Sequence, residues 1–253
     1  MGSNTAFYSG GFFINTCKVC RDMVYLLQAF WGFCLRYYFT EENEMNRTEN
    51  REGKWKFPFV EYSPSETNEK LPLIIQLHGA GERGEGKEDL SLVDVHGFSS
   101  LLKDREYKCR FIMPQCPKND YWAVRVESIL EFIEQLKAEF SVDEDRIYLT
   151  GLSMGGFGTW FTATASPKTF AAIAPVCGGG MAWAAGTLTM PIWVFHGAED
   201  KTVLPVYSDM MVEKLESVGA DVRYTRLEGV RHNVWDNAYT EELLLWLLSK
   251  KRK

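Results

Sequence analysis

Residues 150–156 read Thr-Gly-Leu-Ser-Met-Gly-Gly and place Ser153 between two glycines. A short β-favouring run, 146–150, precedes the serine, and residues 154–165 suit a packed helix. A strand, a sharp turn and a helix in this order form a nucleophile elbow, which pushes a hydroxyl out of the backbone. Glycines around the serine lack a Cβ, so strand and helix can approach closely while the serine takes a strained conformation. We therefore predict Ser153 as a catalytic nucleophile.

An acid and a base follow in the order that such a nucleophile needs. Residues 191–197 are continuously apolar, as in a buried parallel strand, and Asp200 comes after them. Residues 222–227 alternate like a further strand, and His232 follows it. Serine, acid and histidine in this chain order are typical of the α/β-hydrolase fold. The imidazole accepts the serine proton and later returns it, and the carboxylate orients the imidazole.

Alternatives exist for both partners. Glu199 competes with Asp200 for the role of the acid, but Asp200 stands where the strand has ended and the loop can turn inward. The chain has four histidines, at positions 78, 96, 196 and 232. His78 and His196 end apolar strands and are interpreted as structural, and His96 is an outside candidate for the base. His232 alone lies in a late loop after the acid.

A glycine-rich loop supplies the expected oxyanion hole. Residues 73–77 form a predicted strand that runs into the loop 78–84. In this fold one backbone N–H of such a loop acts with that of the residue after the nucleophile, which assigns Ala80 and Met154. A phosphate-binding loop is the competing interpretation, but the Gly-Lys-Ser/Thr ending is missing.

The substrate pocket is less well defined by the sequence. The loop 115–122 follows the predicted strand 111–114 and should open on the catalytic edge of the sheet. Tyr121 and Trp122 are therefore candidate pocket walls, together with Gly81 of the glycine-rich loop. For Trp122, simple packing beside a helix start is an equal alternative.

Three motifs together resemble a known family. They are the loop 78–84 (His-Gly-Ala-Gly-Glu-Arg-Gly), the segment 146–156 and the segment 196–200 (His-Gly-Ala-Glu-Asp). They resemble α/β-hydrolase serine esterases labelled predicted peptidases or phospholipase/carboxylesterase-like proteins, with polyhydroxybutyrate depolymerases and feruloyl esterases as looser relatives. The resemblance spans residues 57–250. It implies a serine esterase with a triad of Ser153, Asp200 and His232.

The expected function is hydrolysis of short-chain carboxylic esters through an acyl-enzyme. Feruloyl or acetyl ester hydrolysis on plant polysaccharides is the alternative, followed by a serine peptidase or a non-catalytic binding protein. No metal and no organic cofactor is expected.

The fold class follows from the alternation of strands and helices. We predict an α/β-hydrolase fold with a mostly parallel central sheet and helices on both faces. The strand near Val176 and the next one are separated by residues 178–189, which is too short for a large lid domain. The catalytic domain is expected over residues 45–253, with 40–54 as a polar linker.

Residues 1–44 do not match the rest of the chain. They are rich in aromatic residues but interrupted by charges, so they predict neither a membrane span nor a signal peptide. Three interpretations stay open: a packed helix, a weak membrane-surface anchor, or non-native upstream sequence before a start at Met45. A homo-oligomer formed through this segment is a further expectation.

Composition bounds the partners and the compartment. The formal charge of −6 argues against nucleic acid and anionic membranes, which leaves a small-molecule ester as the expected partner. The six cysteines are expected to be mostly free, buried thiols, which suits a reducing, cytoplasmic location.

Overall fold

A computed structural model describes residues 39–40, 44–51, 53–65 and 68–252 of the chain. Residues 40–253 cluster into one compact unit. Residues 1–38 and 41–43 lie outside the described residues, so the predicted extension and its boundary at residue 45 stay predictions. No helix in the described part of the chain combines the length and apolar character that a membrane crossing needs.

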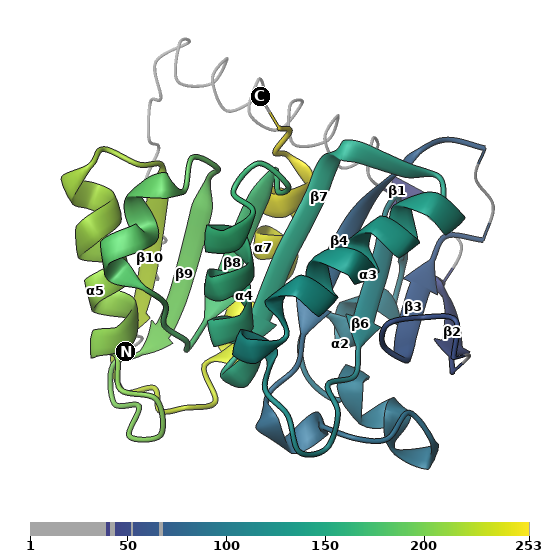
Figure 1. Cartoon of the computed structure of the whole chain (residues 1–253), viewed down its shortest axis with the longest axis horizontal. Helices are drawn as coiled ribbons and strands as arrows, with labels where there is room; N and C mark the ends of the chain where they lie inside the picture. The colour runs from purple at the N-terminus through teal and green to yellow at the C-terminus, as the bar shows by residue number, and fades with distance from the viewer. Residues whose placement is uncertain (1–38, 41–43, 52, 66–67, 253) are drawn as a thin grey trace, which may run out of the picture. The chain divides into compact units, whose positions relative to one another are not determined.

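The centre of the domain is an eight-stranded sheet in the order β10-β9-β8-β7-β4-β6-β3-β2 (Figure 1). Neighbouring strands from β10 to β6 pair in parallel, whereas β3 and β2 are antiparallel to their neighbours. This is the mostly parallel sheet of the predicted α/β-hydrolase fold. The strand bounds are β2 Asn46–Asn50, β3 Phe59–Ser63, β4 Leu71–Leu77, β6 Arg110–Pro114, β7 Val142–Leu152, β8 Ala172–Val176, β9 Ile192–Gly197 and β10 Val222–Leu227.

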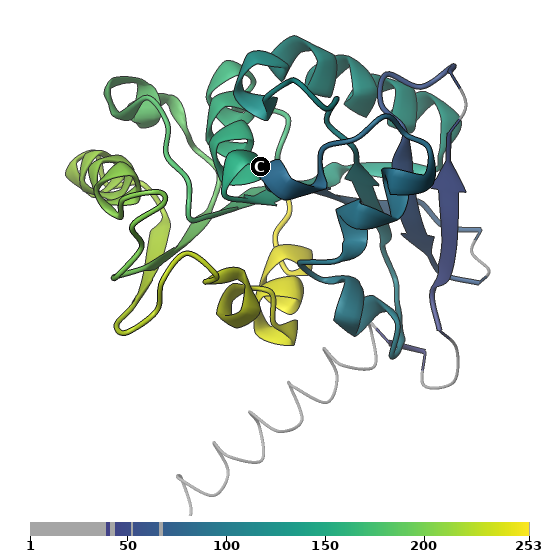
Figure 2. The same ribbon diagram turned by 90° about the horizontal axis from the view of Figure 1, so that it is seen from below.

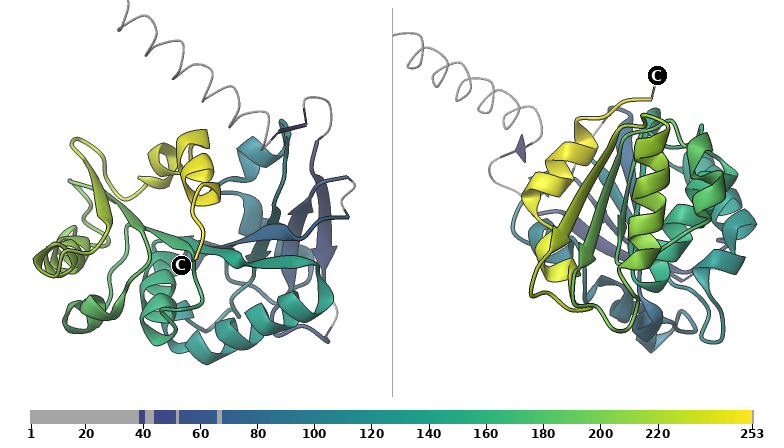
Figure 3. Two further views of the ribbon diagram at one scale, coloured as in Figure 1. Left: turned by 90° about the horizontal axis from the view of Figure 1, so that it is seen from above. Right: turned by 90° about the vertical axis from the view of Figure 1, so that its left-hand side faces the viewer.

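Helices cover both faces of the sheet, as predicted. Figure 2 shows α3 and α4 on one side of the sheet and α7 on the other, and the right view of Figure 3 separates α5 from α7 in the same way. The long helices are α3 Val126–Glu139, α4 Met154–Ala165, α5 Val206–Ser217 and α7 Glu241–Leu248. Short elements are α2 Ser99–Leu102, α6 Trp235–Ala238, the 3₁₀ helices η1 Ala80–Glu82, η2 Glu88–Asp94, η3 Trp122–Val124 and η4 Ala182–Thr187, and the paired strands β1 Phe39–Thr40 and β5 Glu106–Tyr107.

Local sequence signals match these helices. In α3 apolar side chains three or four positions apart are buried, at Ile129, Ile133 and Leu136. The helix α7 begins after Thr240, whose side chain caps it by accepting a hydrogen bond from the backbone N–H of Leu243. Between β8 and β9 the connection holds only η4, so the described chain has no lid domain at this position.

One expectation about the N-terminal side is wrong. Residues 40–54 are predicted as a linker, but β2 pairs with β3 as an antiparallel edge strand. An edge strand is held by backbone hydrogen bonds and needs no alternation of apolar side chains. The polar sequence of β2 therefore gave no sign of a strand. Arg47 on β2 also reaches Asp94 at 2.7 Å, and Tyr62 donates a hydrogen bond to the same carboxylate at 2.7 Å.

The turn after β7 is where the backbone is most crowded. A Cβ placed on Gly155 would lie 1.9 Å from the carbonyl oxygen of Leu77, and a Cβ on Gly151 would lie 2.4 Å from the carbonyl oxygen of Gly155. Both contacts involve backbone atoms, which cannot rotate away. The two glycines are therefore required because α4 crosses the ends of β4 and β7 at this distance.

This crowding gives a first test. We expect Gly155→Ala to prevent folding, or to lower the free energy of unfolding by about 3 kcal/mol and the melting temperature by roughly 10 °C. Gly53→Ala is the matched control, because no atom lies within 4 Å of its added methyl. Circular dichroism melts compare the three proteins. Equal melting temperatures for Gly155→Ala and the parent would contradict the close approach.

Candidate active site

Ser153 stands at the strained turn between β7 and α4. Its φ of 53° and ψ of −114° are outside the regions that a residue with a side chain normally adopts. The backbone N–H of Ser153 donates to the carbonyl of Val176 at 3.0 Å, which ties the turn to the end of β8. The tight turn and this bond together maintain the strain and point the hydroxyl away from the backbone.

The structure brings the three predicted triad residues together. His232 Nε2 lies 2.9 Å from Ser153 Oγ, and His232 Nδ1 lies 2.6 Å from Asp200 Oδ2. Asp200 follows β9 and is buried, and its Oδ1 accepts backbone hydrogen bonds from Thr202 and Val203 at 2.8 and 2.9 Å. These bonds hold the carboxylate so that it orients the imidazole toward the serine.

The competing candidates take other positions. Glu199 is exposed, and it is Asp200 that contacts His232. His196 is buried and bonds to Ser208 Oγ at 2.7 Å and to the carbonyl of Val203 at 2.9 Å, so it braces the loop that carries Asp200. His96 is half-exposed and packs against the ring of Trp235.

His78 is structural as well. The backbone N–H of Cys116 donates to its Nε2 at 2.9 Å, so Nδ1 carries the hydrogen and donates to the carbonyl of Gly79 at 2.6 Å. Burial lowers the pKa of His78 to about 4. The positive charge of Arg83 acts in the same direction, and the hydrogen bond to Gly79 acts against it. The imidazole is therefore neutral at pH 7.

The two predicted oxyanion donors both begin a helix. Ala80 is the first residue of η1 and Met154 the first residue of α4. N–H groups at such positions have no partner inside their own helix and are available to an anion. Ser153 Cβ would lie 3.8 Å from a Cβ added to Gly79, so the glycine-rich loop lies beside the serine.

The predicted pocket residues separate into two groups. Gly81 and Tyr121 are exposed, and the Tyr121 ring lies 5.0 Å from the guanidinium of Arg83. Their contact with a substrate stays a prediction. Trp122, in contrast, has no exposed surface; its Nε1 donates to the carbonyl of His78 at 3.1 Å and its ring packs on Phe57.

The prediction that Trp122 faces the pocket is therefore wrong. Its side chain supports the glycine-rich loop from beneath, where a substrate arriving from solvent does not reach it. The physical reason is that η3 turns the side chain inward, toward α4, where a Cβ on Gly158 would lie 2.5 Å from the Cβ of Trp122 and 3.2 Å from its Cγ.

Sequence reasoning missed Cys177 as a neighbour of the triad. Its sulfur lies within 4.8 Å of ligand atoms of Asp200 and His232, which makes these three residues the group of potential metal ligands found within the described residues. Asp200 and His232 are already bonded to each other, and burial raises the pKa of the Cys177 thiol. A thiolate ligand is therefore disfavoured here. Cys109, Cys116 and Cys177 are free and buried, as predicted.

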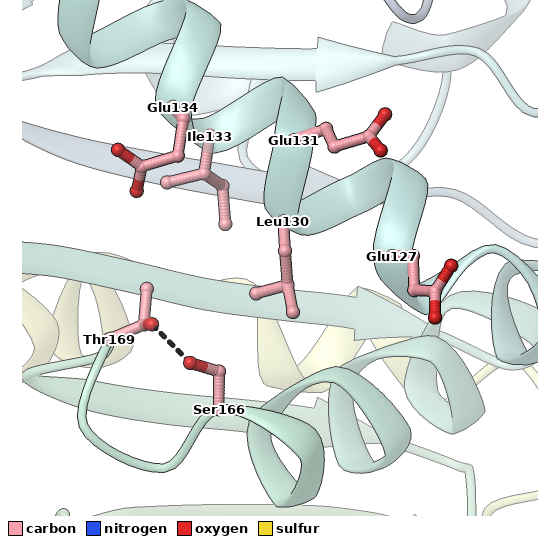
Figure 4. Close-up of a pocket in the computed structure, with 7 residues that line it drawn as sticks. All are labelled: Glu127, Leu130, Glu131, Ile133, Glu134, Ser166 and Thr169. Carbon is pink, nitrogen blue, oxygen red and sulfur yellow. Dashed lines mark hydrogen bonds between the residues drawn. The ribbon is translucent and has the colours of Figure 1, made fainter.

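A surface hollow of about 390 Å³ has no triad residue in its lining. Figure 4 shows the residues that line it. It is formed by α3 and by the turn between α4 and β8. Its acidic side chains are largely paired, because Glu131 contacts Lys56 and Glu134 lies 2.9 Å from Lys137. The hollow has no nucleophile–base pair and is not the active site. Its lining residues are Glu127, Leu130, Glu131, Ile133, Glu134, Ser166 and Thr169.

Comparisons with known proteins agree with the fold. The sequence profile of the prolyl oligopeptidase family matches residues 117–185, which include the elbow. A solved structure of a thermostable esterase superposes with a TM-score of 0.68 at 30% identity, over 83% of this chain and 64% of that one. The chain therefore has the α/β-hydrolase fold.

Two curated relatives support the predicted resemblance to serine esterases. The bifunctional acetylxylan esterase/xylanase XynS20E of Neocallimastix patriciarum is 28% identical over 139 residues, which is 53% of this chain and 20% of the relative. Poly(3-hydroxyalkanoate) depolymerase C of Paucimonas lemoignei is 30% identical over 129 residues, which is 46% of this chain and 30% of the relative. The chain thus spans less than a third of either relative.

The buried imidazole of His78 predicts a pH dependence of stability. Its pKa falls from 6.5 to about 4 on folding, so between these values the unfolded chain binds more protons. The stability that the neutral imidazole contributes is fully present above pH 6.5. As the pH falls from 6.5 to 4, protonation of His78 in the unfolded chain lowers the free energy of unfolding by about 3 kcal/mol. Urea unfolding at pH 7, 5.5 and 4 measures it.

His78→Gln provides the comparison, because an amide does not titrate in this range. We expect the variant to be less stable at pH 7 but to lose less of its unfolding free energy on acidification. A parallel loss in both proteins would show that His78 is protonated in the folded state.

Proposed function

We propose that the chain is a serine carboxylesterase that hydrolyses short-chain carboxylic esters through an acyl-enzyme. The observation that supports this most strongly is the unbroken hydrogen-bond chain from Ser153 Oγ through His232 to Asp200. A serine hydroxyl becomes a nucleophile when a neighbouring base takes its proton, and His232 lies within reach of that proton.

The geometry supports the following sequence of steps. Ser153 Oγ attacks the ester carbonyl while His232 Nε2 accepts its proton. The oxyanion of the tetrahedral intermediate accepts hydrogen bonds from the N–H groups of Ala80 and Met154. His232 then protonates the leaving alcohol, and water, deprotonated by the same nitrogen, releases the acid. Asp200 stabilises the imidazolium throughout without taking up its proton.

Hydrolysis of acetyl or feruloyl esters on plant polysaccharides is the second candidate. It is favoured by the similarity to a protein described as an acetylxylan esterase. A peptidase has weaker support, because the prolyl oligopeptidase profile covers only residues 117–185. A non-catalytic role does not explain why the proton-transfer chain is complete.

The nucleophile is tested with p-nitrophenyl acetate. We expect a burst of one p-nitrophenol per protein, followed by slower turnover, because the acyl-enzyme accumulates. Ser153→Ala should lower kcat by about 10⁴-fold or more. Ser100→Ala in α2, which removes an exposed hydroxyl, is the control and should behave as the parent. Undiminished hydrolysis by a folded Ser153→Ala protein excludes the assignment.

The acid is tested by two neighbouring substitutions. Asp200→Asn should keep the fold but lower kcat about 10⁴-fold, because the amide stabilises the wrong imidazole tautomer. Glu199→Gln should stay within about twofold of the parent, since surface side chains without such contacts contribute little. If Glu199→Gln were instead the damaging change, Glu199 would be the acid.

A further inference from the structure

The carboxylate of Glu82 is largely enclosed, and no described residue donates a hydrogen bond to it. The side chain, on η1, is 14% exposed, and its Oε2 is buried without a hydrogen-bond partner. Oε1 lies 3.8 Å from Nε2 of His96, which is beyond hydrogen-bond distance. Buried polar groups are nearly always paired, so a carboxylate in this state needs an explanation.

Its other imidazole neighbour does not supply the missing donor. His78 Nδ1 lies 3.8 Å from Glu82 Oε2, but its hydrogen is already donated to the carbonyl of Gly79. His78 is also neutral at pH 7, as described above. The carboxylate therefore keeps its full capacity to accept hydrogen bonds. Oε2 is the buried oxygen, and Oε1 is the one on the side of the half-exposed His96.

The position of Glu82 places it beside the reacting atoms. A Cβ added to Gly79 would lie 3.0 Å from Glu82 Oε2 and 3.8 Å from Ser153 Cβ. The carboxylate and the nucleophile thus flank the same glycine, which directly precedes the predicted oxyanion donor Ala80.

The neighbours of Glu82 indicate which half of an ester it faces. The ring of His96 lies 5.3 Å from that of Trp235, and Trp235 lies 5.4 Å from the ring of His232. The leaving alcohol must stand next to His232, because His232 protonates its oxygen. The chain of contacts from His232 through Trp235 and His96 to Glu82 therefore runs along the alcohol side of the site.

We propose that Glu82 forms a hydroxyl-binding subsite for the alcohol half of the substrate, so that the preferred esters are those of polyhydroxy alcohols such as sugars. The inference rests on the esterase function proposed above. A carboxylate accepts hydrogen bonds from hydroxyl groups strongly, and the partly exposed ring of Trp235 offers an apolar face to a sugar ring.

A cationic alcohol such as choline fits this subsite less well. The guanidinium of Arg83 adjoins Glu82 in sequence, and its charge acts on the neighbouring His78. Its Nε bonds to the carbonyl of Ala80 at 2.9 Å, so the positive charge is held at the loop. This positive charge offsets the attraction of the Glu82 carboxylate for a cation, whereas a neutral hydroxyl still finds a strong acceptor there.

The test compares acetates that share an acyl group and differ in the alcohol. We would measure kcat/KM for a monoacetylated methyl pentopyranoside, cyclohexyl acetate and acetylcholine with the parent, Glu82→Gln and Glu85→Gln. Glu85 is an exposed carboxylate directly after the glycine-rich loop and is the matched control. In Glu82→Gln the ratio of the sugar ester to the cyclohexyl ester should fall about tenfold, the effect of losing a hydrogen bond to a charged group. The ratio should not change in Glu85→Gln.

Binding to Ser153→Ala protein provides a readout that does not depend on turnover. The dissociation constant of the sugar ester, measured by NMR titration, should rise about tenfold when Glu82→Gln is added. If the parent hydrolyses none of the esters, the esterase proposal fails and this titration alone decides the subsite. Glu82→Asp, which withdraws the carboxylate, should act in the same direction and replaces Glu82→Gln if that variant does not fold.

Three results would overturn the subsite. The first is an unchanged ratio and an unchanged dissociation constant in Glu82→Gln. The second is an equal fall in Glu85→Gln, which would mean that the loop's charge matters and not this carboxylate. The third is a larger loss for acetylcholine than for the sugar ester, which would identify a cation site.

Discussion

The hydrogen bond between His232 Nε2 and Ser153 Oγ, 2.9 Å long, connects residues 79 positions apart in the chain. It forms only because β7, β9 and β10 are parallel strands of one sheet, so the loops that follow them emerge at one edge. Asp200 reaches the other nitrogen of the same imidazole from the end of β9. A change in strand order or register would separate these groups.

Two loops of the site, the glycine-rich loop and the loop that carries Asp200, are each braced by a buried imidazole that is itself not a base. His78 connects the glycine-rich loop to the backbone N–H of Cys116, and His196 connects the acid loop to Ser208 and Val203. Desolvation lowers the pKa of both rings, which keeps them neutral at pH 7. A neutral imidazole can donate at one nitrogen and accept at the other, so it suits a position between two loops.

The two loops also differ in the surface that they present. The glycine-rich loop carries Glu82 and Arg83. The loop that carries Asp200 leads into exposed apolar side chains at Leu204, Val206 and Tyr207. This division agrees with a site in which one half of an ester is polar and the other is apolar.

The amino-acid sequence by itself determined the elbow, the order of Ser153, Asp200 and His232, and the parallel sheet, because glycine spacing and apolar runs are local signals. The sequence did not predict the edge strand β2, since backbone pairing leaves no pattern in polar side chains. The direction of the Trp122 indole and the place of Cys177 beside the acid were decided by packing between elements distant in the chain. The isolation of the Glu82 carboxylate was likewise a matter of tertiary structure, because it depends on where the hydrogen of His78 is already engaged.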